Sequence, residues 1–143
     1  MTTTIRTASA TLDVRTRGRG LQAFTREVVD WLRKVGPGEG LLTVFIQHTS
    51  ASLLVQENAD PDVQADLERF FERLVPDGDP IFVHDAEGPD DMPSHVRAAL
   101  TQTSVTIPVA GGRLALGTWQ GLYVYEHRKA PHVRRVVLSY VGS

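Results

Sequence analysis

The sequence predicts a single α+β domain spanning residues 1–143, and three observations carry this prediction. Apolar residues follow a helical period over residues 21–35, and strand-like runs dominate after residue 100. Strands and helices do not alternate regularly, as they would in a parallel α/β fold. The chain has 143 residues, of which 41% are hydrophobic. This is enough to enclose one hydrophobic core.

Composition excludes several classes of function. The net charge of -2 comes from 15 basic and 17 acidic residues that are interspersed along the chain, so no basic area is predicted for nucleic acid or a membrane surface. The chain has no cysteine, which excludes disulfides, thiolate nucleophiles and cysteine-bound zinc. Its first residues lack the apolar core of a secretory signal, and no run approaches the roughly 20 apolar residues of a membrane span. We therefore expect a cytoplasmic protein.

The first half of the chain predicts three strands and a helix. Residues 5–14 alternate loosely between β-branched and polar side chains, which is typical of a half-exposed strand. Residues 21–35 form the predicted helix, ending at Gly36. Residues 41–46 are almost continuously apolar, which favours a strand buried on both faces. A strand over residues 51–55 is predicted to follow a sharp change of direction.

A second helix is predicted to begin at Asp60 and Pro61, because Asp caps free amides and Pro needs no amide partner at the first helical position. Its predicted buried face comprises Val63, Leu67, Phe70 and Leu74. Beyond a turn-rich link, the chain predicts a series of short elements. These are a strand at 81–83, a helix at 92–100 and strands at 103–109, 113–116, 122–126 and 133–141.

His48 is the first candidate for chemistry, because it follows a predicted buried strand together with the hydroxyls of Thr49 and Ser50. Strand ends are places where a rigid scaffold presents functional side chains. Alternatively, the hydroxyls satisfy backbone groups in a tight bend and His48 only donates or accepts a hydrogen bond. A Ser-His-Asp hydrolase is a less favoured alternative, since the sequence has no G-x-S-x-G motif.

The second candidate group is His84 and His95, with Glu87, Asp90 and Asp91 between them. Imidazoles and carboxylates from a strand end, a loop and a helix start are able to converge on one divalent cation with a position left open for water. The alternative is structural, because acidic residues before a helix stabilise its dipole. The spacing matches no stringent metal motif.

The third candidate is the glycine-flanked segment 117–121. Its Trp119 and Gln120 are suited to pack against and hydrogen-bond a flat polar ring. Equally, the glycines are typical of a bulge or a strand bend with Trp119 in the core. Arg113 and Arg128 are candidates for clamping phosphate or carboxylate, although most strand arginines are simply solvated.

Taken together, several segments resemble the YjbQ-like family. They are HTSASL at 48–53, ENADP at 57–61, EGPDDMPSH at 87–95, IP at 107–108 and LGTWQG at 116–121. The similarity runs from about residue 20 to 141 with the motifs in matching order. It implies a two-sheet β-sandwich with flanking helices that trimerises about a threefold axis. It also implies a secondary thiamine-phosphate synthase activity, which joins a pyrimidine methyl diphosphate to a thiazole phosphate and releases pyrophosphate.

The resemblance also implies functional residues. Those with an implied catalytic role are His48, His84, His95 and Glu57. Those with an implied substrate-binding role are Thr49, Ser50, Asn58, Asp60, Asp91, Trp119, Gln120, Glu126 and Arg128. Tyr125 departs from the pattern, since several relatives have a cysteine before the glutamate. This departure argues against a mechanism that depends on that thiol.

The leading hypothesis is an enzyme acting on a small phosphorylated metabolite, in which His48, His84 and His95 hold a divalent metal ion, Mg or Zn, and arginines take phosphate oxygens. One alternative is a trimeric module that binds metal or ligand without turnover. Another is a metal-assisted hydrolase. We also expect segment 117–121 and Arg128 to surround the same pocket as His48, and the chain to form a homotrimer without nucleic-acid or membrane partners.

Overall fold

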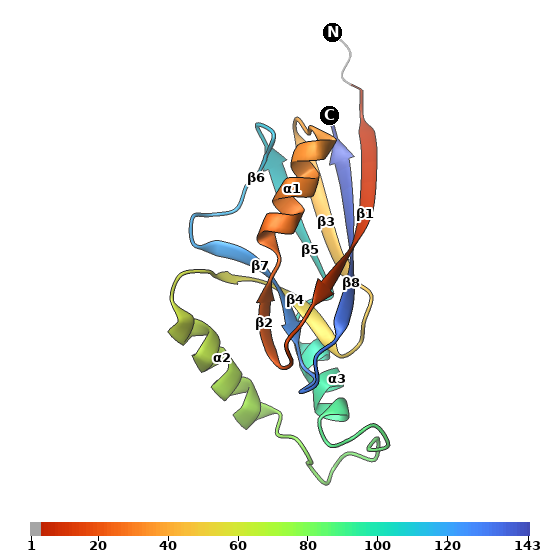
Figure 1. Ribbon diagram of the computed structural model, residues 1–143, viewed down its shortest axis with the longest axis vertical. Helices are drawn as coiled ribbons and strands as arrows, with labels where there is room; N and C mark the ends of the chain where they lie inside the picture. The colour runs from red at the N-terminus through yellow and green to blue at the C-terminus, as the bar shows by residue number, and fades with distance from the viewer. Residues whose placement is uncertain (1–3) are drawn as a thin grey trace.

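The computed structural model describes residues 4–143, which form two antiparallel sheets and three helices (Figure 1). The larger sheet has the strand order β1-β8-β3-β5-β6, and the smaller has the order β2-β7-β4. The helices are α1 (Thr25–Val35), α2 (Pro61–Leu74) and α3 (Asp91–Leu100). The strands are β1 (Arg6–Arg15), β2 (Gly20–Ala23), β3 (Gly40–Ile46), β4 (Ala51–Glu57), β5 (Ser104–Ala110), β6 (Arg113–Leu114), β7 (Gln120–Glu126) and β8 (Val133–Gly142).

The hydrophobic core lies between the two sheets and beneath α1. Strands β3 and β8 contribute one wall and β4 and β7 the other, while α1 adds Val28 and Leu32. The sheet residues in this core include Leu42, Val44, Leu53, Leu122, Val124, Val136 and Leu138. The predicted α+β class and two packed sheets are therefore confirmed.

The first helix begins later than predicted. Residues 21–23 of the predicted helix instead belong to strand β2, in which Leu21 pairs with Tyr125 of β7. The helical spacing of Leu21 was misleading because strand pairing with a distant segment is invisible to local periodicity. The predicted end is confirmed, since Gly36 adopts a left-handed conformation with φ 64° and closes α1.

Strand β3 lies where it was predicted, but it is not buried on both faces. Leu42, Val44 and Ile46 point into the core, whereas Leu41 and Phe45 on the opposite face are exposed. Within residues 4–143, only one face of this sheet packs against the second sheet. An almost continuous apolar run therefore does not mean burial on both sides here.

Helix α2 is capped as predicted, because the Asp60 side chain accepts a hydrogen bond from the Asp62 amide at 2.9 Å. Its predicted buried face was wrong. No residue of α2 is buried, and Phe70 and Leu74 are about half exposed. The helix stands beside the small sheet (Figure 1) and approaches it through Phe71, whose ring lies 5.6 Å from that of Tyr125.

Residues 81–83 do not form the predicted strand. Ile81 ends a turn in which the Phe82 amide donates to the Asp79 carbonyl, and the Val83 side chain is 95% exposed. With no neighbouring strand to pair with, three apolar residues cannot satisfy their backbone as a strand. His84 therefore follows a loop. In the part of the chain that is described, no helix is long and apolar enough to cross a membrane.

Candidate functional site

His84, Asp91 and His95 meet at the start of α3. Asp91 occupies the first turn and His95 lies four residues later on the same face of the helix, while His84 arrives from the preceding loop. Asp91 Oδ2 is 2.7 Å from His84 Nε2 and 3.2 Å from His95 Nε2. One nitrogen from each ring and one carboxylate oxygen lie within 4.8 Å of one another. We call these three residues the His/Asp cluster.

Arg128 fixes the carboxylate of this cluster. Its Nη1 donates to Asp91 Oδ1 at 2.8 Å, its Nε to Asp90 Oδ2 at 3.1 Å, and its Nη2 to the Glu87 carbonyl at 2.9 Å. Burial by itself raises the pKa of Asp91, but the hydrogen bond from His84 and the charges of His95 and Arg128 outweigh it. The pKa therefore lies below its ordinary value and the group is ionised at neutral pH.

The hydrogen bond of His95 to a backbone carbonyl identifies which ring nitrogen carries the hydrogen in the neutral ring. Its Nδ1 lies 2.9 Å from the Thr49 carbonyl, which only accepts, so Nδ1 carries the hydrogen. In the neutral ring the bare Nε2 then faces Asp91 Oδ2, which is also an acceptor. Two acceptors at 3.2 Å repel each other unless a proton or a cation lies between them. A ring held by a backbone carbonyl through one nitrogen, with the other nitrogen free, is typical of a metal ligand.

His48 does not join the His/Asp cluster, where Asp91 stands beside the two histidines instead. Its Nε2 accepts the Arg135 backbone N–H at 2.7 Å, and its Nδ1 lies 3.3 Å from Arg134 Nη1. Burial and then the charge of Arg134 lower the pKa of His48. The two sites are nevertheless neighbours. His48 and His95 line one open groove of about 610 Å³, together with Phe45, Ala98 and other residues.

Ser50 and Glu126 belong to a buried arrangement around Arg134. Glu126 is fully buried, and its Oε1 accepts from Arg134 Nε at 2.8 Å and from the Thr16 hydroxyl at 2.7 Å. Arg134 Nη2 also donates to Ser50 Oγ at 3.0 Å. Arg134 cannot be identified from the sequence, because a buried arginine in a strand has the same local pattern as a solvated one.

Glu57, Asn58 and Asp60 organise the junction between β4 and α2. Glu57 Oε2 accepts from the Ala59 and Asp60 amides at 2.9 and 2.7 Å, and Asp60 caps the helix. Asn58 Nδ2 donates to the Gln120 carbonyl at 3.3 Å. In this structure these polar side chains satisfy backbone groups, which leaves few of their atoms for a ligand.

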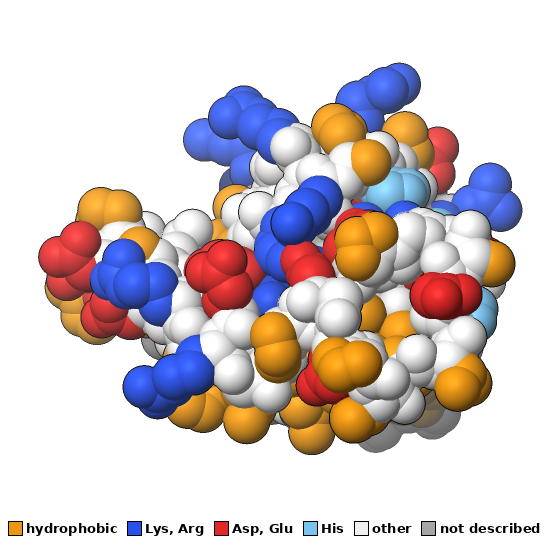
Figure 2. Space-filling view, turned by 90° about the horizontal axis from the view of Figure 1, so that it is seen from below, with side chains coloured by type: hydrophobic (Ala, Val, Ile, Leu, Met, Phe, Trp, Pro, Cys, Tyr) orange, Lys and Arg blue, Asp and Glu red, His pale blue; other side chains and the backbone are white. Residues whose placement is uncertain are grey.

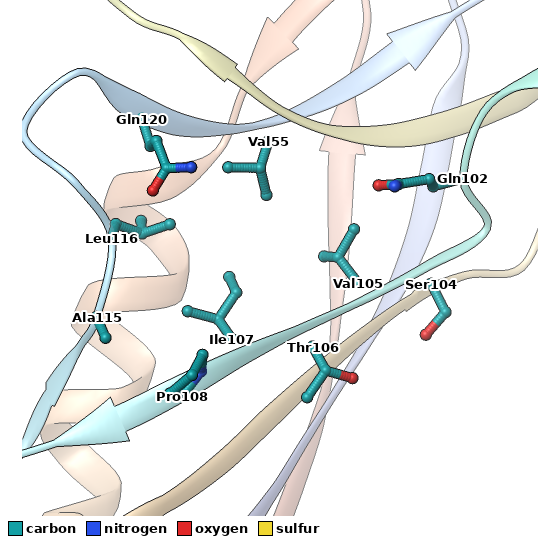
Figure 3. Close-up of a pocket in the computed structure, with 10 residues that line it drawn as sticks. All are labelled: Val55, Gln102, Ser104, Val105, Thr106, Ile107, Pro108, Ala115, Leu116 and Gln120. Carbon is teal, nitrogen blue, oxygen red and sulfur yellow. The ribbon is translucent and has the colours of Figure 1, made fainter.

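Segment 117–121 lies at the start of β7, where Trp119 is 63% exposed and therefore not part of the core. Gln120 Oε1 accepts from the Gly117 amide at 2.8 Å. Gln120 also borders a separate pocket of about 440 Å³, which Figure 3 shows between β5 and the start of β7, with Ile107 and Leu116 on its walls.

The expectation that segment 117–121 and Arg128 surround one pocket with His48 was wrong within a single chain. Strand β7 runs from Gln120 to Glu126, so the segment lies at one end of it and Arg128 lies beyond the other. A seven-residue strand separates its ends by roughly 20 Å. Knowing that β7 packs in the core does not tell which end of this strand lies near the histidines.

The end of the molecule seen in Figure 2 has a mixed surface. Acidic and basic side chains alternate there with hydrophobic ones, and histidine reaches the surface among them. This distribution agrees with the interspersed charges of the sequence and leaves histidine accessible to a small molecule.

Comparison with known proteins places the chain in a family. The profile of the family described as UPF0047 protein YjbQ-like matches residues 10–143. A UPF0047 protein of Synechocystis is 48% identical over 140 residues, covering 98% of this chain and 95% of the relative. The UPF0047 protein YjbQ of Salmonella typhimurium is 44% identical and covers 93% of this chain and 96% of its own length.

A solved structure agrees with these matches. A hypothetical protein from Aeropyrum pernix superimposes with a TM-score of 0.83 at 35% identity, covering 96% of this chain and 99% of that one. The fold, the sequence relatives and the family match agree. The chain belongs to the UPF0047 family of YjbQ-like proteins.

Proposed function

We propose that this protein is a metal-dependent enzyme that acts on a small phosphorylated compound, with the cation held by His84, Asp91 and His95. The observation that supports this most strongly is the bare Nε2 of His95 facing an ionised carboxylate oxygen. A cation between them converts this repulsion into two ligand bonds. Three protein ligands leave a position open for water or substrate, as in catalytic rather than structural sites.

The ligand set favours zinc over magnesium. Imidazole nitrogen suits Zn²⁺, whereas Mg²⁺ prefers six oxygen ligands in octahedral geometry. Arg128 then acts as a positioning residue, because its hydrogen bond to Asp91 Oδ1 leaves Oδ2 directed at the histidines. Three of its five N–H donors are held by Asp90, Asp91 and the Glu87 carbonyl, which fixes the orientation of the guanidinium.

The competing explanation is a proton in place of the metal, with His95 doubly protonated and ion-paired to Asp91. Elemental analysis after dialysis against Zn²⁺ separates the two. We expect one zinc ion per chain in the native protein and a loss of at least tenfold in affinity in Asp91→Asn and His95→Gln. Asp90→Asn is the matched control, because Asp90 contacts Arg128 and neither histidine. Equal zinc content in all four proteins would reject the metal site.

For the reaction, we propose thiamine-phosphate synthesis as the first activity to test, on the basis of the family resemblance. In that condensation the cation would stabilise the negative charge of the departing pyrophosphate. Pyrophosphate release from a pyrimidine methyl diphosphate and a thiazole phosphate should require zinc and fall at least a hundredfold in Asp91→Asn. A panel of phosphorylated metabolites tests the hydrolase alternative in parallel. Zinc binding without any turnover would favour a binding module.

We further propose that the protein assembles as a trimer. Apolar side chains on α2 and on the loop that follows it are exposed in the single chain, among them Phe70, Leu74, Ile81 and Val83. Exposed apolar groups of this kind are often covered by a second chain. Light scattering at micromolar concentration should give three chains per particle, and a monomer would contradict the proposal.

A further inference from the structure

We propose that His48, which lines the groove it shares with His95, forms a phosphate-oxygen subsite with Arg134, whose Nη1 lies 3.3 Å from His48 Nδ1. The proposal deepens the proposed function and rests on it for the class of substrate. The subsite itself follows from an observation about His48 alone. Two N–H donors approach this imidazole, and a neutral imidazole offers only one lone pair.

The bond to Nε2 is the better of the two contacts. The Arg135 backbone N–H lies 2.7 Å from Nε2, where it takes the place of a strand partner just beyond the end of β3. Nε2 is therefore the acceptor, and the hydrogen of the ring must lie on Nδ1. Nδ1–H then faces Arg134 Nη1 at 3.3 Å, so two donors confront each other. Protonating the ring would add a second conflict at Nε2 and so gives no relief.

The remaining nitrogens of Arg134 are satisfied. Nε donates to Glu126 Oε1 at 2.8 Å, and Nη2 donates to Ser50 Oγ at 3.0 Å as well as to Glu126. Only Nη1 lacks a true acceptor among residues 4–143. Arg134 is 96% buried, being 4% exposed, so a donor left unpaired there is costly. One oxygen placed within reach of Nη1 and of His48 Nδ1–H would satisfy both donors at once.

The surroundings favour a phosphate oxygen. Glu126 neutralises the charge of Arg134, but the exposed Arg135 adds a positive charge close enough to His48 to lower its pKa. Multiply charged oxyanions accept stronger hydrogen bonds than neutral carbonyls do. The subsite therefore combines two aimed donors with a nearby basic residue.

The groove links this subsite to the proposed metal. Thr49 follows His48 directly and accepts the hydrogen bond of His95 Nδ1, so both histidines line the same groove. Phe45, Ala98 and Ala99 add an apolar surface between polar walls. This arrangement suits a compound with two phosphoryl groups, or a diphosphate, bound at the metal and at His48, with a small apolar or ring portion against Phe45.

The tautomer of His48 is the first test, because it needs no ligand. Nitrogen NMR of protein with labelled histidine should show His48 as the Nδ1–H tautomer at pH 7.5. The Nε2–H tautomer would overturn the inference, since Nδ1 would then accept from Arg134 and no donor would be left over. Assignment uses His48→Gln, whose side-chain oxygen lies near the Nε2 position and keeps an acceptor for Arg135.

Titration with inorganic phosphate is the second test, using metal-free protein and sodium chloride at equal ionic strength. We expect the His48 signals to shift saturably with phosphate and not with chloride, and phosphate affinity to fall at least fivefold in His48→Gln. His132→Gln is the matched control, because His132 also lies beside Glu126 but does not line the groove. Equal affinity in the two variants would overturn the subsite.

The two proposals fail in different ways. Zinc should perturb the signals of His84 and His95, whereas phosphate should perturb those of His48. A zinc response without a phosphate response removes the subsite and keeps the metal centre. A phosphate response without zinc binding removes the metal-dependent enzyme and leaves His48 and Arg134 as an anion site.

Discussion

His95 and His127 show how differently one side chain is used in two regions of this molecule. Each makes one good hydrogen bond, His95 through Nδ1 to the Thr49 carbonyl and His127 through Nε2 to the Ser52 hydroxyl at 2.9 Å. The second nitrogen differs. That of His95 faces the Asp91 carboxylate in a partly exposed site, whereas that of His127 is buried and has no partner among residues 4–143.

The difference follows first from the burial of His127 and then from the charges around its ring. Burial, reinforced by the positive charges of Arg97, Arg19 and Arg134, lowers the pKa of His127 to about 3. His127 is therefore neutral at any physiological pH. We call His127, Ser52, Arg97 and Glu68 the buried layer. In it, His127 Nε2 lies 2.9 Å from the Ser52 hydroxyl, and Arg97 donates to Glu68 at 2.9 Å. The layer organises the packing of α2 and α3, while the His/Asp cluster keeps a nitrogen available for chemistry.

The largest expected effect is on the buried layer. Arg97→Met should lower the free energy of unfolding by about 3 kcal/mol, because it removes a fully buried charge together with its hydrogen bonds to the partly exposed Glu68 and to the Val75 carbonyl. Urea unfolding measures it. Arg69→Met is the control, since its ion pair with Asp66 is exposed and should contribute less than about 0.5 kcal/mol. A comparable loss of stability in both variants would show that Arg97 contributes no more to folding than an arginine in an exposed ion pair.

The pH dependence of stability should distinguish the two histidines next. The folded pKa of His127 lies near 3, below the unfolded value near 6.5, so only the unfolded chain takes up this proton between these values. Its stabilising contribution is complete above pH 6.5 and is lost as the pH falls. Between pH 6.5 and 5 the loss should be about 2 kcal/mol.

His127→Gln should remove this part of the slope, as measured by urea unfolding at several pH values. His132→Gln, in which the replaced ring is partly exposed, should retain it. If the slope were the same in all three proteins, His127 would have to be protonated in the folded state.

A smaller effect is expected from the residue that orients Asp91. Arg128→Gln removes the hydrogen bond to Oδ1 but leaves all three proposed ligands in place. Zinc affinity should fall about tenfold, as is usual for partners of metal ligands. Competition with a chelator measures it, with Arg113→Gln as the control on an exposed arginine. A loss as large as that of Asp91→Asn would mean that Arg128 holds the cluster together rather than tuning it.

The sequence predicted what depends on local chemistry. The Asp60 cap, the left-handed Gly36 and the position of β3 all follow from neighbours along the chain. Residues 81–83 and the start of the first helix did not, because whether an apolar segment becomes a strand depends on a distant partner. The exposed face of α2 is a similar case, since periodicity indicates an apolar face but not what covers it.

The candidate site shows the same division. Asp91 and His95 are four residues apart on one helix, so their contact follows from local geometry, and both are among the predicted site residues. His48 had been assigned to the metal because it ends a strand, yet its ring turns to the backbone of β8. Arg134 is not among the predicted site residues, since its burial depends on the long-range pairing of β8 with β3.

The smallest effect is expected at Trp119, an exposed aromatic residue that joins neither histidine region. Its side chain is 63% exposed and lies at the far end of β7 from Arg128. Trp119→Ala should change the free energy of unfolding of a single chain by less than about 0.5 kcal/mol, as for most surface substitutions. Zinc affinity and phosphate binding should be unchanged, because no contact connects Trp119 to either site within residues 4–143.

If turnover falls while both binding constants stay the same, Trp119 must reach the reacting compound from a neighbouring chain. That result would join the trimer to the catalytic site, whereas a loss of metal in the variant would contradict the separation of the two ends of β7.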